Sequence, residues 1–158
     1  MEGYCDEPFR YNLCDTHPVW RYNFVTGGQW DALSPPRHFS RGSCFATVYA
    51  EETGGESIVS CGGTSRTDGS KACQQYFIDD DRWDHFPPMN VGRVYCALVE
   101  FHGSLYVFGG MEYGESPYYG LKVFSSVERW DPKTRRWTLL DAEMPLPLYA
   151  LGGVKLLP

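Results

Sequence analysis

Carboxylates and histidines are the first side chains in this sequence that could carry out chemistry. Three consecutive acids, Asp79, Asp80 and Asp81, could act in general acid–base catalysis or bind a cation. The four histidines lie far apart, at His17, His38, His85 and His102. They form neither an HxH nor an HExxH spacing that would hold a metal, and no GxSxG nucleophile motif occurs. The sequence therefore predicts no catalytic residue, no metal site and no cofactor.

Cysteines could form disulfides, bind zinc or act as nucleophiles. The six are Cys5, Cys14, Cys44, Cys61, Cys73 and Cys96. They form no CxxC pair and no Cys/His cluster with zinc-finger spacing, and without a secretory signal we expect reduced thiols. Cys44, Cys61 and Cys96 fall in apolar runs, which predicts buried, inert side chains. Cys5 and Cys14 lie in a polar segment and could instead form a disulfide or a redox pair.

The composition favours short strands and turns. The chain of 158 residues is 42% apolar and 16% aromatic, and 17 glycines and 11 prolines interrupt it every few residues. A net charge of −6 provides no basic field for phosphates, so we expect no nucleic-acid partner. The N-terminal residues do not read as a signal peptide, and no apolar run has membrane-spanning length. We therefore expect no membrane contact and a cytoplasmic location.

A repeated pattern organises the chain. An apolar run ends in paired glycines twice, at Gly62-Gly63 and again 47 residues later at Gly109-Gly110. Downstream of each pair, two aromatic residues stand seven apart: Tyr76 with Trp83, and Trp130 with Trp137. The second copy has seven extra residues between its glycines and its aromatics, which must lie within MEYGESPYYGLKVFSS.

The register of the repeat also extends upstream. RGSCFATVY at 41–49 matches RVYCALVEF at 93–101. This alignment pairs Arg41 with Arg93 and Cys44 with Cys96.

Each copy reads as four short antiparallel strands, a to d. In the first copy we expect 44–49, 58–61, a strand with Tyr76 and a strand from Trp83; in the second, 96–101, 105–108, a strand with Trp130 and a strand from Trp137. The aspartates at 79–81 then fall in the c–d turn, where solvation explains them better than catalysis. Such a unit buries both faces only by stacking on the next, with its aromatics in the wedge between them.

These residues resemble the kelch repeat. LYVFGG, SSVERWDPKTRRWTLL and MPLPLYALGGVKLL show its apolar run ending in Gly-Gly, its aromatic in strand c and its Trp opening strand d. The resemblance implies an all-β fold of kelch-type β-propeller blades with four antiparallel strands each. It divides the chain into 1–18 (unplaced), 19–36 (strands c and d of a partial blade), 41–88 and 89–143 (kelch repeats) and 144–158 (the first strand of a further blade).

The strand count gives an incomplete ring of about two to three blades, whereas a closed propeller needs four or more. Three outcomes follow from that difference. The chain is a piece of a larger ring, or it self-associates to close one, or its edge strands stay open. We favour the first.

A kelch-like ring usually binds its partner through the b–c and d–a connections, which project toward one rim. The b–c loops here are 64–72 and 111–122. Within these connections we predict the partner-binding residues Arg41, Arg66, Arg93, Tyr113, Tyr118 and Tyr119. The arginines just before strand a could bind a partner's carboxylate or tie one blade to its neighbour. The tyrosines could contact a partner or fold the long loop onto the blade.

The resemblance implies a protein-interaction module without a reaction of its own. Many kelch proteins are substrate receptors of cullin-type ubiquitin ligases, joined there through a BTB domain that these 158 residues do not contain. The alternatives are a propeller enzyme and a truncated fragment without independent function.

Overall fold

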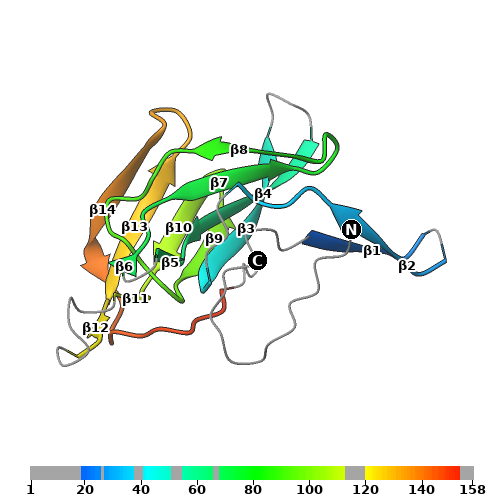
Figure 1. Cartoon of the computed structure of the whole chain (residues 1–158). Helices are drawn as coiled ribbons and strands as arrows, with labels where there is room; N and C mark the ends of the chain where they lie inside the picture. Colours follow the sequence, from blue (N-terminus) through cyan, green and yellow to red (C-terminus); the bar gives the residue numbers. More distant parts are fainter. Residues whose placement is uncertain are drawn as a thin grey trace. The chain divides into compact units, whose positions relative to one another are not determined.

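Figure 1 shows the computed structural model of the chain, which describes residues 19–25, 27–37, 41–50, 55–65, 68–112 and 120–153. The chain divides into two compact units, Met1–Phe39 and Ser40–Pro158. Every regular element in the described residues is a β-strand, so the all-β prediction is confirmed. None of those residues belongs to a helix that could cross a membrane.

The first unit contains an antiparallel hairpin of β1 (Val19–Asn23) and β2 (Gln29–Leu33). Tyr22 lies directly opposite Trp30, with ring centroids 5.0 Å apart. The two residues stand eight apart in the sequence because the turn of the hairpin lies between them. Trp30 is 64% exposed.

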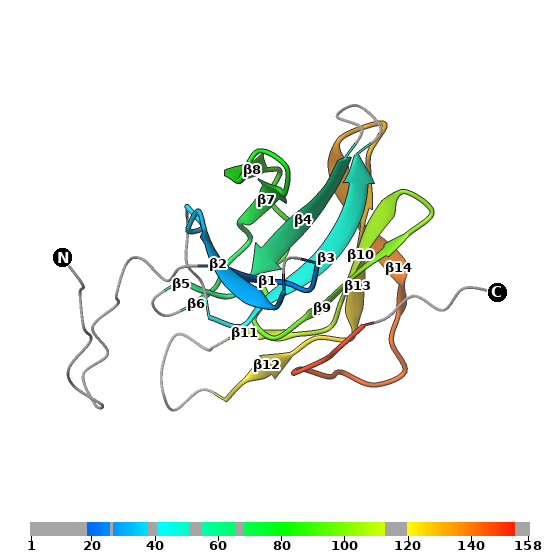
Figure 2. The same cartoon turned by 90° about the vertical axis from the view of Figure 1, so that its right-hand side faces the viewer.

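The second unit contains two four-stranded antiparallel sheets, which we call blade 1 and blade 2 (Figure 2). Blade 1 has the order β3 (Ser43–Ala50), β4 (Gly55–Gly62), β7 (Cys73–Phe77), β8 (Arg82–Phe86). Blade 2 has the order β9 (Ala97–Phe101), β10 (Ser104–Phe108), β13 (Ser126–Asp131), β14 (Arg136–Glu143). The predicted four-stranded units are confirmed, and no closed ring is seen in the described residues.

Each b–c connection carries a two-stranded ribbon that the sequence did not predict. The ribbons are β5 (Thr64–Ser65) with β6 (Asp68–Gly69), and β11 (Met111–Glu112) with β12 (Lys122–Val123). Two residues separate β5 from β6, whereas nine separate β11 from β12. The seven-residue insertion therefore falls between the strands of the second ribbon, inside the predicted segment.

The hydrophobic core lies between the two blades and contains residues from both. The ring of Phe86 in blade 1 lies 4.7 Å from that of Trp130 in blade 2. Trp137 packs 5.7 Å from Trp130, and its indole N–H donates to the carbonyl oxygen of Pro87 at 2.9 Å. The prediction that Trp130 and Trp137 fill the wedge between blades is confirmed. Such rings bury on the order of 150–250 Å² each.

The four described cysteines are all paired, so the prediction of reduced thiols is wrong. Cys61 bonds to Cys73, with Cα atoms 4.2 Å apart, and Cys44 bonds to Cys96, with Cα atoms 5.6 Å apart. The spacing of the cysteines in the sequence did not indicate these bonds, because pairing across strands and between blades brings the sulfurs together. Their burial, predicted for Cys44, Cys61 and Cys96, is confirmed.

The first strands of the two blades, β3 and β9, align differently in the structure than in the sequence comparison. The difference is one residue. Opposite the first glycine of each pair stands Ser43 in blade 1 and, in continuation of the β9–β10 register, Cys96 in blade 2. The counterpart of Cys96 is therefore Ser43, and the proposed match between Arg41 and Arg93 is wrong by one residue. A slip of one residue moves a strand's side chains to the other face of the sheet.

Residues 144–153 form no strand, although the sequence predicted the first strand of a further blade over 144–158. Main-chain hydrogen bonds hold this segment against blade 2 at Leu148, whose N–H donates to Phe124 at 3.2 Å and whose carbonyl accepts from Gly110 at 2.9 Å. The remainder of the predicted strand, 154–158, lies outside the described residues.

Candidate functional site

The b–c ribbons and the d–a connections lie against one another at one end of the blades. We call this band the loop rim: ribbons β5–β6 and β11–β12 with residues 41–42, 93–95 and 148–150. Thr64 donates its N–H to the carbonyl of Arg41 at 2.9 Å, and Val94 and Met111 exchange two such bonds of 2.8 and 2.9 Å. β6 and β11 are also in contact. The rim lies toward the lower side of the two blades in Figure 1, away from the β13–β14 turn.

The paired glycines turn the chain from each blade into the rim. All four have positive φ: Gly62 76°, Gly63 96°, Gly109 57° and Gly110 88°. A side chain on Gly62 would collide with the carbonyl oxygen of Arg93, and one on Gly109 with that of Leu148. Because they lack a side chain, Gly62 and Gly109 leave room for the backbone of the d–a connection. The close approach at Gly62 and Gly109 is thus to the backbone of this connection.

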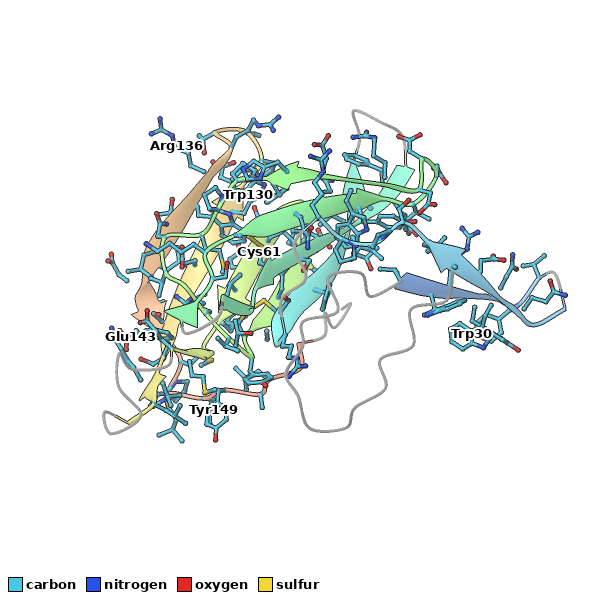
Figure 3. All side chains as sticks on the ribbon, viewed as in Figure 1. Trp30, Cys61, Trp130, Arg136, Glu143 and Tyr149 are labelled. Atoms are coloured by element: carbon cyan, nitrogen blue, oxygen red, sulfur yellow. A yellow bond between two sulfur atoms is a disulfide. The ribbon has the colours of Figure 1, made fainter. Side chains whose placement is uncertain are left out.

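Large apolar side chains remain exposed in and beside the rim. Their exposed fractions are 40% for Tyr95, 49% for Leu121, 46% for Leu148 and 47% for Tyr149. Figure 3 shows Tyr149 at the rim end of the blades. Tyr95 has a φ of 55°, which is uncommon for a bulky residue, and two main-chain hydrogen bonds fix it: its N–H to Gly42 and its carbonyl from Ala150.

The structure describes two of the six predicted partner-binding residues. Arg41 lies in the rim and is exposed. Arg93 also comes from the rim backbone, but its side chain is fully buried. The other four, Arg66, Tyr113, Tyr118 and Tyr119, lie outside the described residues.

Arg93 forms a buried ion pair with Glu128 of β13, both side chains being closed to solvent. The guanidinium donates to the Glu128 carboxylate at 3.3 Å, to the Gly109 carbonyl at 2.7 Å and to the hydroxyl of Ser126 at 2.8 Å. It also lies 5.1 Å from the ring of Phe124. Burial lowers the pKa of Arg93 below its ordinary value, and the charge of Glu128 acts in the opposite direction.

This pair joins the two blades. The backbone carbonyl of Arg93 accepts a 2.7 Å bond from Gly63 of blade 1, while its side chain bonds to blade 2. Glu128 in turn accepts bonds from the backbone of Asn90 at 2.8 Å and of Val91 at 3.0 Å. The prediction that Arg93 contacts a partner is therefore wrong. The alternative, that Arg93 ties one blade to its neighbour, is confirmed.

Sequence reasoning missed Glu128, although a signal was present. Glu128 stands two residues before Trp130 on the same strand, so both side chains occupy the core-facing side of blade 2. A carboxylate in such a position needs a buried cation. Arg93, the one charged residue of the connection at 87–96, was the available partner.

The acidic cluster at 79–81 shows the geometry of a solvated turn. Asp79 and Asp80 are exposed between β7 and β8. Arg82 forms surface ion pairs with Asp80 at 3.6 Å and with Asp84 at 2.6 Å. Within the described ranges, no group of three or more His, Cys, Asp or Glu could hold a metal ion.

Comparison with known proteins agrees with this geometry. The model of the kelch motif matches residues 92–141, which span β9 to most of β14. An F-box/kelch-repeat protein of Arabidopsis thaliana is 28% identical over 131 residues, covering 82% of this chain and 29% of that protein. Kelch-like protein 21 of Rattus norvegicus is 32% identical over 89 residues, covering 56% of this chain and 14% of that protein.

The fold is also found among solved structures. A fungal alcohol oxidase in complex with copper superposes with a TM-score of 0.64 at 15% identity, covering 84% of this chain and 28% of the oxidase. At that identity the likeness concerns the fold alone. The chain spans less than a third of the length of these proteins. Residues 92–141 form a kelch motif, and the chain is distantly related to the kelch-like and F-box/kelch-repeat proteins.

Proposed function

We propose that this chain is a protein-interaction module whose partner binds at the loop rim. The observation that carries the proposal is that the rim combines a fixed backbone with exposed apolar and aromatic side chains. Its backbone is fixed by glycines, main-chain hydrogen bonds and the Arg93–Glu128 pair, whereas Tyr95, Leu148 and Tyr149 stay exposed. Rigid apolar and aromatic side chains on a fixed backbone bind at low entropic cost.

The proposal includes the second ribbon, where the insertion places Tyr113, Tyr118 and Tyr119 between β11 and β12. Tyrosines in such a loop add contact area that the first ribbon lacks. We propose no reaction for the chain and a cytoplasmic location.

A more specific role is substrate recognition for a cullin-type ubiquitin ligase. The relative from Arabidopsis thaliana joins kelch repeats to an F-box by name, which supports a receptor function for the repeats. In this role the rim holds the substrate. A ligase component would bind elsewhere in the assembly.

The test compares two variants by quantitative affinity capture. In the first, Tyr113, Tyr118 and Tyr119 are replaced together by serine. The control replaces His102 and Arg135, which lie in turns at the other end of the blades, by serine. We expect specific partners to be lost only from the tyrosine variant, with unchanged thermal melting. Equal capture by both variants contradicts the proposal, and loss of folding in the tyrosine variant shows that the tyrosines are structural.

A further inference from the structure

The four described cysteines form one buried group at the base of the loop rim. Cys44, Cys61 and Cys73 stand directly opposite one another across β3, β4 and β7. Their side chains therefore share one face of blade 1, in the core between the blades. Cys96 reaches this row from the d–a connection that leads into β9, and Figure 3 shows Cys61 in the interior.

Each disulfide fixes one component of the rim. The Cys61–Cys73 bond closes the segment 62–72, which contains the whole first ribbon. The Cys44–Cys96 bond links β3 of blade 1 to Cys96, which directly follows Tyr95 of the rim. It spans 52 positions in the sequence and crosses from one blade to the other.

Blade 2 lacks the corresponding bonds. Its counterpart of the Cys61–Cys73 pair is Phe108 opposite Val127, so the second ribbon is closed without a disulfide, by the strand ladder and main-chain hydrogen bonds. The disulfides are thus confined to one repeat and to the junction between repeats, and they are not part of the repeated framework. A feature that the framework does not require calls for a separate explanation.

We propose that Cys44–Cys96 is a reversible redox latch that fixes the loop rim when oxidised and releases the d–a connection when reduced. The inference rests on the proposed function of the rim and on the proposed cytoplasmic location. Disulfides in a reducing compartment are mostly transient or redox-sensing, whereas those of exported proteins are permanent staples.

The reductant is a dithiol. When the rim opens locally and exposes the buried bond, one of the dithiol's thiolates attacks a sulfur, forms a mixed disulfide and expels the other cysteine as a thiolate, which takes up a proton. The second thiol of the reductant then displaces the remaining cysteine and closes its own disulfide. Two electrons and two protons pass from the dithiol to the cysteine pair, and an oxidised dithiol reverses the exchange.

The reduced protein keeps its fold. Both sulfurs lie in an apolar core, where a free cysteine behaves as a small hydrophobic residue. The blades also remain joined by the Arg93–Glu128 pair and by the ring contact of Phe86 with Trp130. What the reduced state loses is the covalent anchor next to Tyr95, so that local opening of the rim becomes easier.

Hydrogen exchange followed by mass spectrometry tests the latch without any partner. The full chain is equilibrated in buffers of a reduced and an oxidised dithiol with increasing reduced fraction, and alkylation reports the state of each cysteine. We expect Cys44 and Cys96 to become alkylated together in the reduced buffers. The amides of Val94 and Met111, each of which donates to the carbonyl of the other residue across the rim, should then exchange about tenfold faster, while those of β13 stay unchanged.

Two variants separate the latch from a general loss of stability. Cys44→Ala with Cys96→Ala should exchange as the reduced protein does in every buffer. The matched control, Cys61→Ala with Cys73→Ala, should keep the redox response at Val94. A Cys44–Cys96 bond that survives the fully reduced dithiol buffer in the native protein, or reduction without faster exchange at Val94, overturns the proposal.

The same experiment stays independent of the proposed function. If the tyrosine variant captures partners as the wild type does, the rim is not the binding surface, yet the redox response of its amides is still measured. If partners bind and the amides do not respond, the latch alone fails.

Discussion

Replacing Glu128 by glutamine exchanges one carboxylate oxygen for an amide nitrogen at the centre of the junction between the blades. One carboxylate oxygen accepts bonds from the backbone and side-chain N–H groups of Asn90, at 2.8 and 2.9 Å. The other accepts from the backbone of Val91 at 3.0 Å and from Arg93 at 3.3 Å. Because donors surround both oxygens, the amide nitrogen of glutamine must face N–H groups in either orientation.

The expected cost follows from burial. Glu128→Gln leaves the Arg93 guanidinium without its counter-charge in a site closed to solvent, and its Nε–H already has no hydrogen-bond partner in the described structure. Breaking a buried pair in this way typically costs about 3–5 kcal/mol. For a chain of this size that corresponds to a fall in Tm of about 6–20 °C.

Urea unfolding followed by tryptophan fluorescence measures the loss, because Trp130 and Trp137 lie in the same core. Glu143→Gln, at an exposed position on β14, is the matched control and should stay within about 0.5 kcal/mol of the wild type. Combining Glu128→Gln with Arg93→Met should cost less than the two single changes added together, by about 1 kcal/mol or more. A loss below about 1 kcal/mol for Glu128→Gln would refute the buried tie.

Substitutions at two positions and one pH titration test separate parts of the fold. Trp137→Ala should cost about 3–5 kcal/mol in urea unfolding, since it empties the wedge between blades, and Trp137→Phe should cost clearly less. Gly109→Ala should lower the Tm by several degrees, because its φ is 57° and the new methyl group would meet the carbonyl of Leu148. The pKa of Asp131 lies below its ordinary value, mainly because the backbone of Lys133 donates to its carboxylate at 2.9 Å. The stability this turn provides is present above the unfolded-state pKa and is lost as the pH falls through the lower folded-state value, which NMR titration of the carboxyl group should show.

The strands could be predicted from sequence because their signals are local. Gly62 and Gly109 mark the ends of strands b, and the aromatic pairs record residues that face each other across the c–d turn. A spacing of seven between Trp130 and Trp137 is set by hairpin geometry alone, so it can be read without knowing what the ring packs against.

The contacts between blades could not be predicted in the same way. Arg93 and Glu128 are 35 residues apart, and Cys44 and Cys96 are 52 apart, so that stacking of the blades and not chain proximity brings each pair together. The rim ribbons were missed for another reason. Two-residue strands such as β5 carry no periodic pattern to detect.

The claim that the rim is the binding surface is tested most directly by photo-crosslinking from single positions in cells. A photoreactive amino acid replaces Tyr95 in the rim in one variant and His102 in the other. Cys96, next to Tyr95, precedes β9, and His102 follows it, so the two probes lie at opposite ends of the same strand. We predict a discrete crosslinked protein from position 95 and none from position 102. Equal labelling from both positions, or a partner captured from position 102 alone, would contradict the account.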